Sequence, residues 1–327
     1  MRESVAKNIM VNIRAFFTVN IRRRLNDNST KISRLESIID TLDETITERY
    51  HYLNLLDYYA HHEDEAQRYQ KELDYLQQRT KYCNFPYNPD STLINVISGH
   101  DQEAKLPYVI HKNKKLFFKA AHTPLEAVDL YRNYLVQERL LGDDYCESAP
   151  HQYQSPNIHV EKGDVLFDIG AAEGLFALDQ IDKASHVVIV ESDPEWIEPL
   201  KHTFAPYGSK VTILQKFVSA TDTETTISLG TLLSDVEYNS AFIKMDIEGH
   251  ELSSVVSATS VLKQKKGTKL SVASYHKQHD AEELKAFFEN IGYHFEFSTG
   301  YMLFHLYDTP APPYFRHGII RTRNSSL

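Results

Sequence analysis

Hydrophobic residues change their spacing along the chain, and this spacing separates three regions. Between residues 32 and 79 there is no proline or glycine, and apolar residues recur at intervals close to three and four: Leu35, Ile38, Leu42, Ile46, Leu53 and Leu56. That spacing predicts one long helix or a helical hairpin. The turn-rich stretch NFPYNPDST, at residues 84–92, predicts a break after it. We therefore expect a helical N-terminal extension over residues 1–85.

Residues 86–155 are predicted to connect this extension to the third region. YVIHKNKKLFF, at residues 108–118, has two short β-type runs around Lys112–Asn113–Lys114 and predicts a β-hairpin. TPLEAVDLYRNYLVQERLL follows at residues 123–141 and opens with Thr123 before Pro124. Proline is favoured at the first position of a helix, so this stretch predicts a helix.

Residues 156–327 show a different pattern, in which short apolar runs alternate with helix-length connections: DVLFDIG, HVVIVES, KVTILQK, AFIKMDI and KLSVASY. This predicts a parallel sheet covered by helices on both faces. YHFEFSTGYMLFHLY, at residues 293–307, predicts two strands around Ser298–Thr299–Gly300, a turn too short for a crossover. The predicted fold class is therefore α/β, a Rossmann-like and mostly parallel sheet with a C-terminal antiparallel hairpin. The arrangement resembles the fold of S-adenosylmethionine (SAM) methyltransferases.

Charge and cysteine content narrow the function classes. The formal net charge of -10 and a sequence pI near 5.9 argue against nucleic acid as a partner, because phosphate binding needs a basic surface. Two cysteines, Cys83 and Cys146, are too few for a disulfide framework and are consistent with a reducing compartment. These features favour a small-molecule substrate.

The N-terminal residues 1–24 contain the most apolar early segment, residues 9–21. Asn12, Arg14 and Asn20 interrupt it, so we expect neither a signal segment nor a spanning helix, and a cytoplasmic location. The basic residues around it allow a weak contact with a membrane surface, although the pattern favours a docked or frayed amphipathic helix. The apolar stripe of the following helices could form a homodimer, and packing within the chain explains it equally well.

The first strand of the third region leads directly into a glycine-containing turn, a place where backbone N–H groups can hold an anionic group. A dinucleotide fingerprint requires glycine at 170, 172 and 175, whereas the chain has Gly170, Ala172 and Leu175, with Gly174 instead. Asp168-x-Gly170-x-x-x-Gly174 resembles the corresponding loop of SAM methyltransferases. We expect Gly170 to let the backbone approach the ligand and Gly174 to let the helix pack close to the strand.

Further cofactor contacts are expected at the ends of the next strands. Glu191 follows Gly170 by 21 residues, where a carboxylate can accept hydrogen bonds from ribose hydroxyls. The alternative role of helix cap suits Asp193 better. Phe217 is placed to stack on adenine, although a core position explains it as well. The candidate cofactor-binding residues are Asp168, Gly170, Glu173, Gly174, Glu191, Phe217 and Asp246.

The fourth strand ends in IKMDIEGHE, at residues 243–251, which brings Asp246, Glu248, His250 and Glu251 together around Gly249. Crowded carboxylates repel one another, so such a cluster points to a bound ligand. DIGAAEGLF (168–176), ESDP (191–194) and above all KMDIEGHE (244–251) resemble the FkbM family of SAM-dependent methyltransferases, whose hallmark is K-x-D-x-E-G-x-E. SYHKQHDAEEL (274–284) and PYFRHGIIR (313–321) extend the resemblance.

The resemblance covers residues 160–321, more weakly 105–155, and leaves out the first hundred residues. Two positions depart from the family pattern. Leu229–Gly230 stands where the family has a Leu-Asp pair, and His250 stands where a small residue is usual. Glycine at position 230 puts one polar contact of the family in doubt, and His250 adds a titratable group to the site.

The resemblance implies a SAM-dependent O-methyltransferase that acts on a hydroxyl of a glycan, a lipid-linked sugar or another small hydroxylated metabolite. Methyl transfer is an in-line displacement that needs alignment and a proton acceptor. Asp246 is the candidate for the group beside the methyl, and His250 and His276 are candidate bases, with a surface or core role as the alternative for each. No metal is predicted; the alternative is a divalent cation held by Asp246, Glu248 and His276 or His279.

Two other functions compete with this interpretation. One is a non-catalytic methyltransferase-like domain that serves as a binding partner of another enzyme; the motif residues kept at 168, 170, 174, 191 and 246 count against it. The other is a nicotinamide-dependent oxidoreductase, which the missing third fingerprint glycine and the predicted terminal hairpin disfavour. The identity of the acceptor depends on pocket-lining loops, and fold does not encode it.

Overall fold

The computed structural model describes residues 29–79, 85–86, 94–138, 149–304 and 310–324, and the structural statements below concern these residues. The chain divides into two compact units, Met1–Tyr82 and Cys83–Leu327. The predicted membrane-surface contact of residues 1–24 lies outside the described residues. Among the helices that the structure describes, none has both the length and the apolar character needed to cross a membrane.

The described part of the first unit is helical: α2 (Ser29–Ala60), α3 (Glu63–Arg68) and α4 (Gln70–Arg79). The chain turns after α2, so the helical hairpin is the form it takes. Its buried side chains include Tyr52, Leu55, Tyr59, Tyr69, Leu73 and Leu76. Ile38, Leu42 and Leu53 of the predicted apolar stripe are about half exposed instead, and pairing of two copies through this stripe stays a prediction.

The second unit begins with a small antiparallel sheet in the order β1-β2-β3, built from β1 (Ser98–Asp101), β2 (Leu106–His111) and β3 (Lys114–Phe117). Lys112 and Asn113 have positive φ, as a tight hairpin turn requires. Helix α5 (Pro124–Gln137) follows. The Thr123 hydroxyl accepts from the N–H of Glu126, whose carboxylate accepts from the N–H of Thr123, so a capping box starts the helix. The predicted hairpin and helix are both present.

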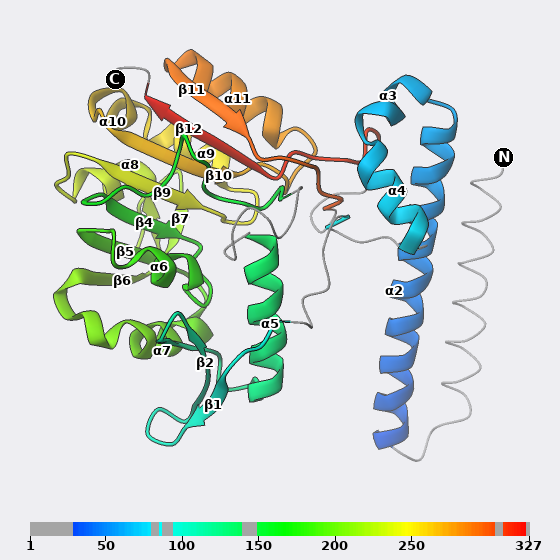
Figure 1. The fold of residues 1–327 in the computed structure, drawn as a ribbon, viewed down its shortest axis with the longest axis horizontal. Coiled ribbons are helices and arrows are strands. Elements are labelled where there is room, and N and C mark those ends of the chain that lie inside the picture. The colour runs from blue at the N-terminus through cyan, green and yellow to red at the C-terminus, as the bar shows by residue number, and fades with distance from the viewer. Residues whose placement is uncertain (1–28, 80–84, 87–93, 139–148, 305–309, 325–327) are drawn as a thin grey trace. The chain divides into compact units, whose positions relative to one another are not determined.

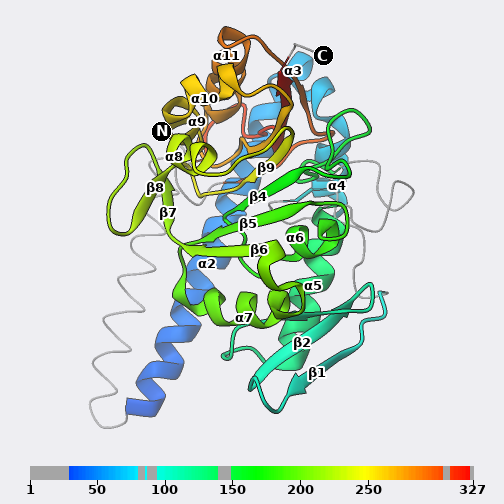
Figure 2. The ribbon, with the colours of Figure 1, turned by 90° about the vertical axis from the view of Figure 1, so that its left-hand side faces the viewer.

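A seven-stranded sheet forms the centre of the second unit, in the order β11-β12-β10-β9-β4-β5-β6 (Figures 1 and 2). Its strands are β4 (Val165–Ile169), β5 (His186–Glu191), β6 (Val211–Gln215), β9 (Ala241–Met245), β10 (Thr268–Ala273), β11 (Tyr293–Phe297) and β12 (Ile319–Asn324). Neighbours from β10 to β6 pair in parallel, and β12 pairs antiparallel with both β10 and β11. The predicted fold class is confirmed.

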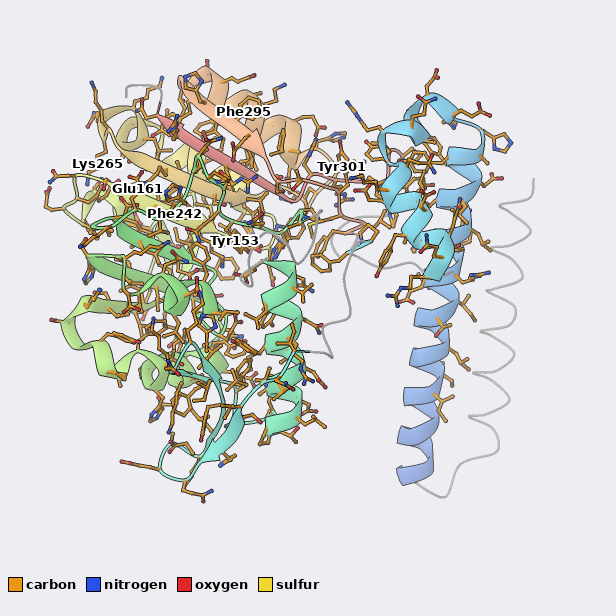
Figure 3. All side chains as sticks on the ribbon, viewed as in Figure 1. Tyr153, Glu161, Phe242, Lys265, Phe295 and Tyr301 are labelled. Atoms are coloured by element: carbon orange, nitrogen blue, oxygen red, sulfur yellow. The ribbon has the colours of Figure 1, made fainter. Side chains whose placement is uncertain are left out.

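Helices cover both faces of this sheet. Successive strand residues point to opposite faces, so Leu166 and Phe242 lie in one buried cluster while Phe167 and Ile243 lie in another. The first cluster, which also contains Tyr153, joins the sheet to α5, α6 (Leu175–Gln180) and α7 (Pro194–Phe204) (Figure 3). The second joins it to α8 (Leu229–Ser234), α9 (Glu251–Ser257), α10 (Thr259–Gln264) and α11 (Asp280–Asn290). The remaining elements are η3 (Ala205–Lys210), β7 (Phe217–Ser219) and β8 (Thr226–Ser228).

The predicted terminal hairpin is wrong in its second strand. Residues 301–304, which directly follow the Ser298–Gly300 turn, contribute only an isolated bridge from Met302 to Arg316. The partner of β11 is β12, which begins at Ile319. A strand between β10 and β11 must be buried on both faces, and residues 319–322 are all buried. The turn-forming residues therefore mark a bend in the chain rather than a tight hairpin.

Candidate active site

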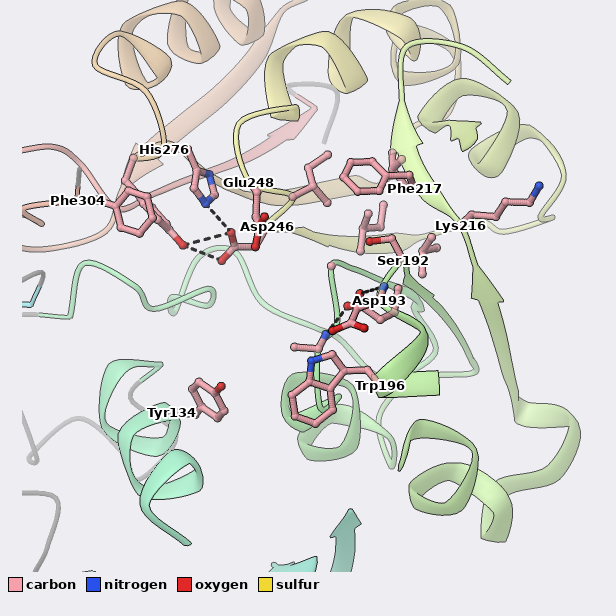
Figure 4. A pocket seen from close by; sticks show the side chains of 18 residues that line it. Tyr134, Ser192, Asp193, Trp196, Lys216, Phe217, Asp246, Glu248, His276 and Phe304 are labelled. Carbon is pink, nitrogen blue, oxygen red and sulfur yellow. Dashed lines mark hydrogen bonds and ion pairs between the residues drawn. The ribbon is translucent and has the colours of Figure 1, made fainter. Parts of the chain in front are cut away.

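A cavity of about 880 Å³ lies at the carboxyl ends of β4, β5 and β9 (Figure 4). Gly170 follows β4, Glu191 ends β5 and Asp246 follows β9, and all three line the cavity. The chain continues from β4 to β5 on one side, whereas β9 joins β4 on the other. In sheets of this type, ligands bind where the strand order reverses. The cavity is therefore the candidate active site, and its lining includes Phe217 and His276 among the predicted residues.

At both loop glycines, protein atoms lie too close to leave room for a side chain. A Cβ on Gly170, whose φ is 71°, would lie 1.8 Å from the carbonyl oxygen of Asp246. A Cβ on Gly174 would lie 2.7 Å from Leu200 and 2.9 Å from Phe204 of α7. Gly170 thus lets β4 and β9 end side by side, and Gly174 lets α6 approach another helix rather than the strand. Gly170 therefore keeps the loop close to the end of β9.

Gly170→Ala is expected to lower the free energy of unfolding by about 2 to 3 kcal/mol, because it adds both left-handed strain and a backbone clash. Gly163→Ala is the matched control, since Gly163 also has a positive φ but its Cβ would meet nothing within 4 Å. That control is expected to cost only about 1 kcal/mol. Denaturant unfolding of the two variants measures the difference, and equal losses would contradict the close approach at Gly170.

Glu191 ties the loop to the tip of β5. One carboxylate oxygen accepts from the N–H of Ala172 at 2.8 Å, and the other accepts from the N–H of Asp193 at 2.8 Å. A carboxylate oxygen can accept more than one hydrogen bond, so both remain able to receive a ligand hydroxyl. Asp193 caps α7 by accepting from the N–H of Glu195, which is the role predicted for it, and it also pairs with Lys119 at 2.6 Å.

Phe217 and His250 lie at another edge of the site. Phe217 lines the cavity and is 40% exposed, so its ring can meet a ligand. His250 meets that ring edge-on, with 5.6 Å between ring centroids, but it is exposed and does not line the cavity. Gly230, the other departure from the family pattern, packs against α9, because a Cβ there would lie 2.8 Å from the Ser257 carbonyl oxygen. A larger residue at position 230 would force α8 and α9 apart.

Asp168 lies beneath the loop rather than in the cavity. It is fully buried, and its carboxylate lies 3.2 Å from Nζ of Lys244, which is also buried. Lys244 donates in addition to the carbonyl of Gly170. Burial alone would lower the pKa of Lys244, but the charges of Asp168, Asp246 and Glu138 raise it. The lysine is therefore a fixed cation that supports the loop from below.

Two further carboxyl groups surround this lysine. Glu173 is buried and does not line the cavity, and burial raises its pKa to about 7, with the charge of Asp168 adding to the effect and that of Lys244 opposing it. Glu138 follows α5, and burial together with the charge of Glu173 raises its pKa well above the usual range. Its Oε2 atom is buried without a hydrogen-bond partner among the described residues. Sequence reasoning missed Glu138.

Glu173→Gln is expected to raise the free energy of unfolding at pH 8 by the order of 2 kcal/mol and to have little effect near pH 4. The folded-state pKa of Glu173 is raised to about 7 from its ordinary value of 4.5, so the folded state binds an extra proton between these values. The wild type therefore loses stability as pH rises through this window, and glutamine removes that loss. Urea unfolding across the pH range is the measurement, and a pH-independent difference would contradict it.

Asp246 is the centre of a polar cluster at the far end of the cavity. Four side chains contact its carboxylate: the hydroxyls of Tyr153 at 2.7 Å and Tyr275 at 3.0 Å, and Nε2 of His151 at 3.1 Å and of His276 at 3.3 Å. Burial alone would raise the pKa of Asp246, but the hydrogen bond from His151 and the nearby positive charges hold it well below its usual range. Asp246 is therefore a fixed anion and a poor proton acceptor.

His276 bridges two carboxylates. Its Nε2 lies 3.3 Å from Asp246 (Figure 4). Its Nδ1 lies 3.0 Å from Glu251, which is buried. Burial opposes the charge, but Glu251 and Asp246 raise the pKa of His276 above its usual value. With both ring nitrogens engaged, an imidazolium here suits a structural link between the two carboxylates. It does not suit the predicted role of proton acceptor.

Two of the predicted alternative metal ligands, Asp246 and His276, come together, whereas Glu248 and His279 do not join them. Glu248 and His279 are both exposed, and the group that gathers in the described part of the chain is Asp246, Glu251 and His276, with ligand atoms within 4.8 Å of one another. A cation at their centre would compete with the His276 ring, which already spans the two carboxylates. The donor set therefore fits a charged histidine better than it fits a metal ion.

Three groups around Asp246 were not predicted. Tyr275 directly precedes His276 after β10, so its position at a strand end was a usable signal. His151 and Tyr153 come from the loop before β4, and nothing in their spacing points to a site. They reach Asp246 only through the tertiary fold.

Comparisons with known proteins were made on sequence and on structure. No protein-family model matches the sequence, and a search of curated proteins also gives no match. Among solved structures, the chain is similar to the methyltransferase FkbM from Methylobacillus flagellatus KT, with 19% identity, a TM-score of 0.41, and coverage of 61% of this chain and 54% of that one. The chain thus spans about half the length of that protein.

Two further structures show the range of the similarity. A precorrin-6y C5,15-methyltransferase from Geobacter metallireducens GS-15 is 14% identical with a TM-score of 0.35, over 50% of this chain and 79% of that one. A rRNA methylase from Streptococcus thermophilus is 8% identical with a TM-score of 0.33, over 50% and 89%. These resemblances are distant, so a function for this chain has to come from its own site.

Proposed function

We propose that the chain is a SAM-dependent methyltransferase that transfers the methyl group to a hydroxyl of a glycan, a lipid-linked sugar or another small hydroxylated metabolite. One observation carries the proposal. Glu191 and Asp246 line one cavity from strands on either side of β4, with the Gly170 loop between them. SAM has a nucleoside at one end and a positively charged sulfonium near the other. A site for it needs a carboxylate that binds the ribose, a loop whose backbone passes close to the ligand, and a fixed negative charge near the sulfonium.

The residues present fit SAM. Glu191 would accept from the ribose hydroxyls, and Phe217 would stack on the adenine. Asp246 would face the sulfonium side, where a nearby negative charge is compatible with a cationic cofactor. When bound, SAM supplies an electrophilic methyl group. The cavity of about 880 Å³ is of the size that cofactor sites usually have.

The wall beside Asp246 supports a cyclic acceptor. Tyr275 and Phe304 meet edge-on with 4.8 Å between ring centroids, and Phe304 also meets His276 at 5.3 Å. All three line the cavity. Aromatic faces next to a hydrogen-bonded anion suit a ring that carries hydroxyl groups, such as a sugar. These residues would orient the acceptor and help keep water from the methyl group.

Glu191→Gln is expected to weaken SAM binding by about 10- to 100-fold, because charge-assisted hydrogen bonds to the ribose are lost. Glu195→Gln is the matched control, since Glu195 is an exposed carboxylate that pairs with Lys119 and does not line the cavity. Calorimetric titration of both variants with SAM gives the dissociation constants. An unchanged affinity in Glu191→Gln would remove Glu191 from the proposed site.

A further inference from the structure

The segment PYFRHGIIR, at residues 313–321, leads into β12 and lies outside the cavity lining. It contains two arginines that are almost completely buried: Arg316 is 4% exposed and Arg321 is 6% exposed. A cation is costly to remove from water, so a buried arginine needs acceptors that hold it. Both arginines find these acceptors in the two loops that carry the contacts of Asp246.

Arg316 holds the loop after β10. Its Nη1 donates to the carbonyls of Tyr275 at 2.9 Å and His276 at 3.0 Å. Its Nη2 donates to Oε1 of Gln278 at 3.0 Å. A planar guanidinium has its donors in fixed directions, so it sets where several acceptors lie relative to one another. Arg316 therefore fixes the backbone of two residues that line the cavity and contact Asp246.

Arg321 holds the loop before β4. Its Nη1 donates to the carbonyl of Gln154 at 2.9 Å and to that of Gln152 at 3.3 Å. These two residues flank Tyr153, whose hydroxyl donates to the Asp246 carboxylate at 2.7 Å. Arg321 therefore fixes the backbone on both sides of another contact of Asp246.

Gly318, between the two arginines, lets the segment pass close to both loops. A Cβ there would lie 1.9 Å from the carbonyl oxygen of Pro150, which directly precedes His151. The carbonyl of Gly318 accepts from the N–H of Ser274, which directly precedes Tyr275. The segment has this position because β12 pairs with β10 inside the sheet. One short stretch of chain thus connects the two loops that surround Asp246.

We propose that Arg316 and Arg321 are positioning residues for methyl transfer, which hold the two loops so that the contacts on the Asp246 carboxylate stay in place. This inference rests on the proposed function. Neither arginine lines the cavity, so both act through the loops and not on the substrate. A displacement of about 1 Å at a distance from the reacting groups can cost about 10²-fold in rate.

Transfer kinetics give the first readout. Arg316→Lys keeps the charge but replaces the planar fork by one ammonium group, which cannot donate in the same directions. With ³H-methyl SAM and a panel of methyl glycosides, we expect kcat to fall about 10- to 100-fold. The SAM dissociation constant should stay unchanged, because Glu191 and the Gly170 loop are not altered. Arg321→Lys should act in the same way, whereas Arg323→Lys, at an exposed position of the same strand, should match the wild type.

A second control separates positioning from stability. Tyr293→Phe removes a buried hydrogen bond to the carbonyl of Leu262, away from the cavity lining. We expect it to lower the midpoint of urea unfolding and to leave kcat unchanged. An equal fall of kcat in Tyr293→Phe and Arg316→Lys would assign the arginine a purely structural role and overturn the proposal.

The titration of His276 in the full chain needs neither an acceptor nor SAM. Burial lowers the pKa of His276, and its contacts with Glu251 and Asp246 raise it above the usual value. Arg316→Lys keeps a positive charge nearby, so a change in this pKa reports the distance to those carboxylates. We expect the pKa of His276 to fall by about 1. NMR of the chain with ¹⁵N-labelled histidine measures it, and His276→Gln identifies the signals by their absence.

An unchanged pKa of His276 in Arg316→Lys would overturn the positioning role, whatever the rate. If the chain does not bind SAM, the proposed function fails, and the titration still shows whether the arginine holds the loop. If the chain binds SAM and both the pKa and kcat are unchanged in Arg316→Lys, this inference alone is wrong.

Discussion

Asp246→Asn is expected to lower the rate of methyl transfer by about 10²- to 10³-fold. In the wild type, the carboxylate is held by Tyr153, Tyr275, His151 and His276 and is kept ionised by them. The amide keeps the shape but removes a fixed charge beside the reacting methyl, and losses of this size are usual when one preorganised electrostatic group is removed.

The measurement is transfer of ³H-methyl from SAM to a hydroxylated acceptor, with the SAM affinity determined separately. Glu237→Gln serves as the control, because Glu237 is an exposed carboxylate that does not line the cavity and has solvent to screen its charge. We expect that control to change the rate by less than about tenfold, as surface charges act weakly. Equal effects of the two substitutions would show that charge in general, and not the buried cluster, matters.

Lys244→Met is expected to lower the free energy of unfolding by about 3 to 5 kcal/mol. Removing one member of a buried ion pair leaves the other uncompensated. Here Asp168 is fully buried at 3.2 Å from the lysine, and Asp246 and Glu138 also interact with it. The loss should be larger at pH 8 than at pH 5, because the remaining carboxyl groups can take up protons in acid.

Denaturant unfolding at the two pH values measures this loss. Lys201→Met is the control: Lys201 and its partner Glu198 are both about 60% exposed, so their pair at 3.6 Å should contribute less than about 1 kcal/mol. A Lys244→Met variant as stable as that control would mean that the acids under the loop are neutral. That result would contradict the ion pairing of Lys244 with ionised carboxylates under the loop.

The sheet was predictable where the pattern is local. Short apolar runs in the sequence correspond to β4, β5, β6, β9 and β10. Helix-length connections between such runs favour parallel pairing, which the sheet has. The error at β12 has a physical reason. β11 pairs with β12, a strand that begins more than twenty residues later and fills the position beside β10. A local turn signal such as Ser298–Gly300 contains no information about which strand fills that position.

The site was predictable where it lies at strand ends. Gly170, Glu191 and Asp246 each follow or end a parallel strand, and the carboxyl ends of such strands meet at one edge, so the sequence alone brings them together. His151 and Tyr153 lie 95 and 93 residues from Asp246 along the chain. Their loop is held against β10, where the Ser271 hydroxyl donates to the carbonyl of Tyr153, and residue spacing does not predict that contact.

The central claim is that the cavity binds SAM, and calorimetric titration of the purified chain with SAM, S-adenosylhomocysteine and NAD tests it most directly. We predict saturable binding of the first two and none of NAD, since Ala172 and Leu175 occupy two fingerprint glycine positions. Saturable binding of NAD alone would favour an oxidoreductase. Absence of binding by all three would contradict the account, and the acidic cluster would require another ligand.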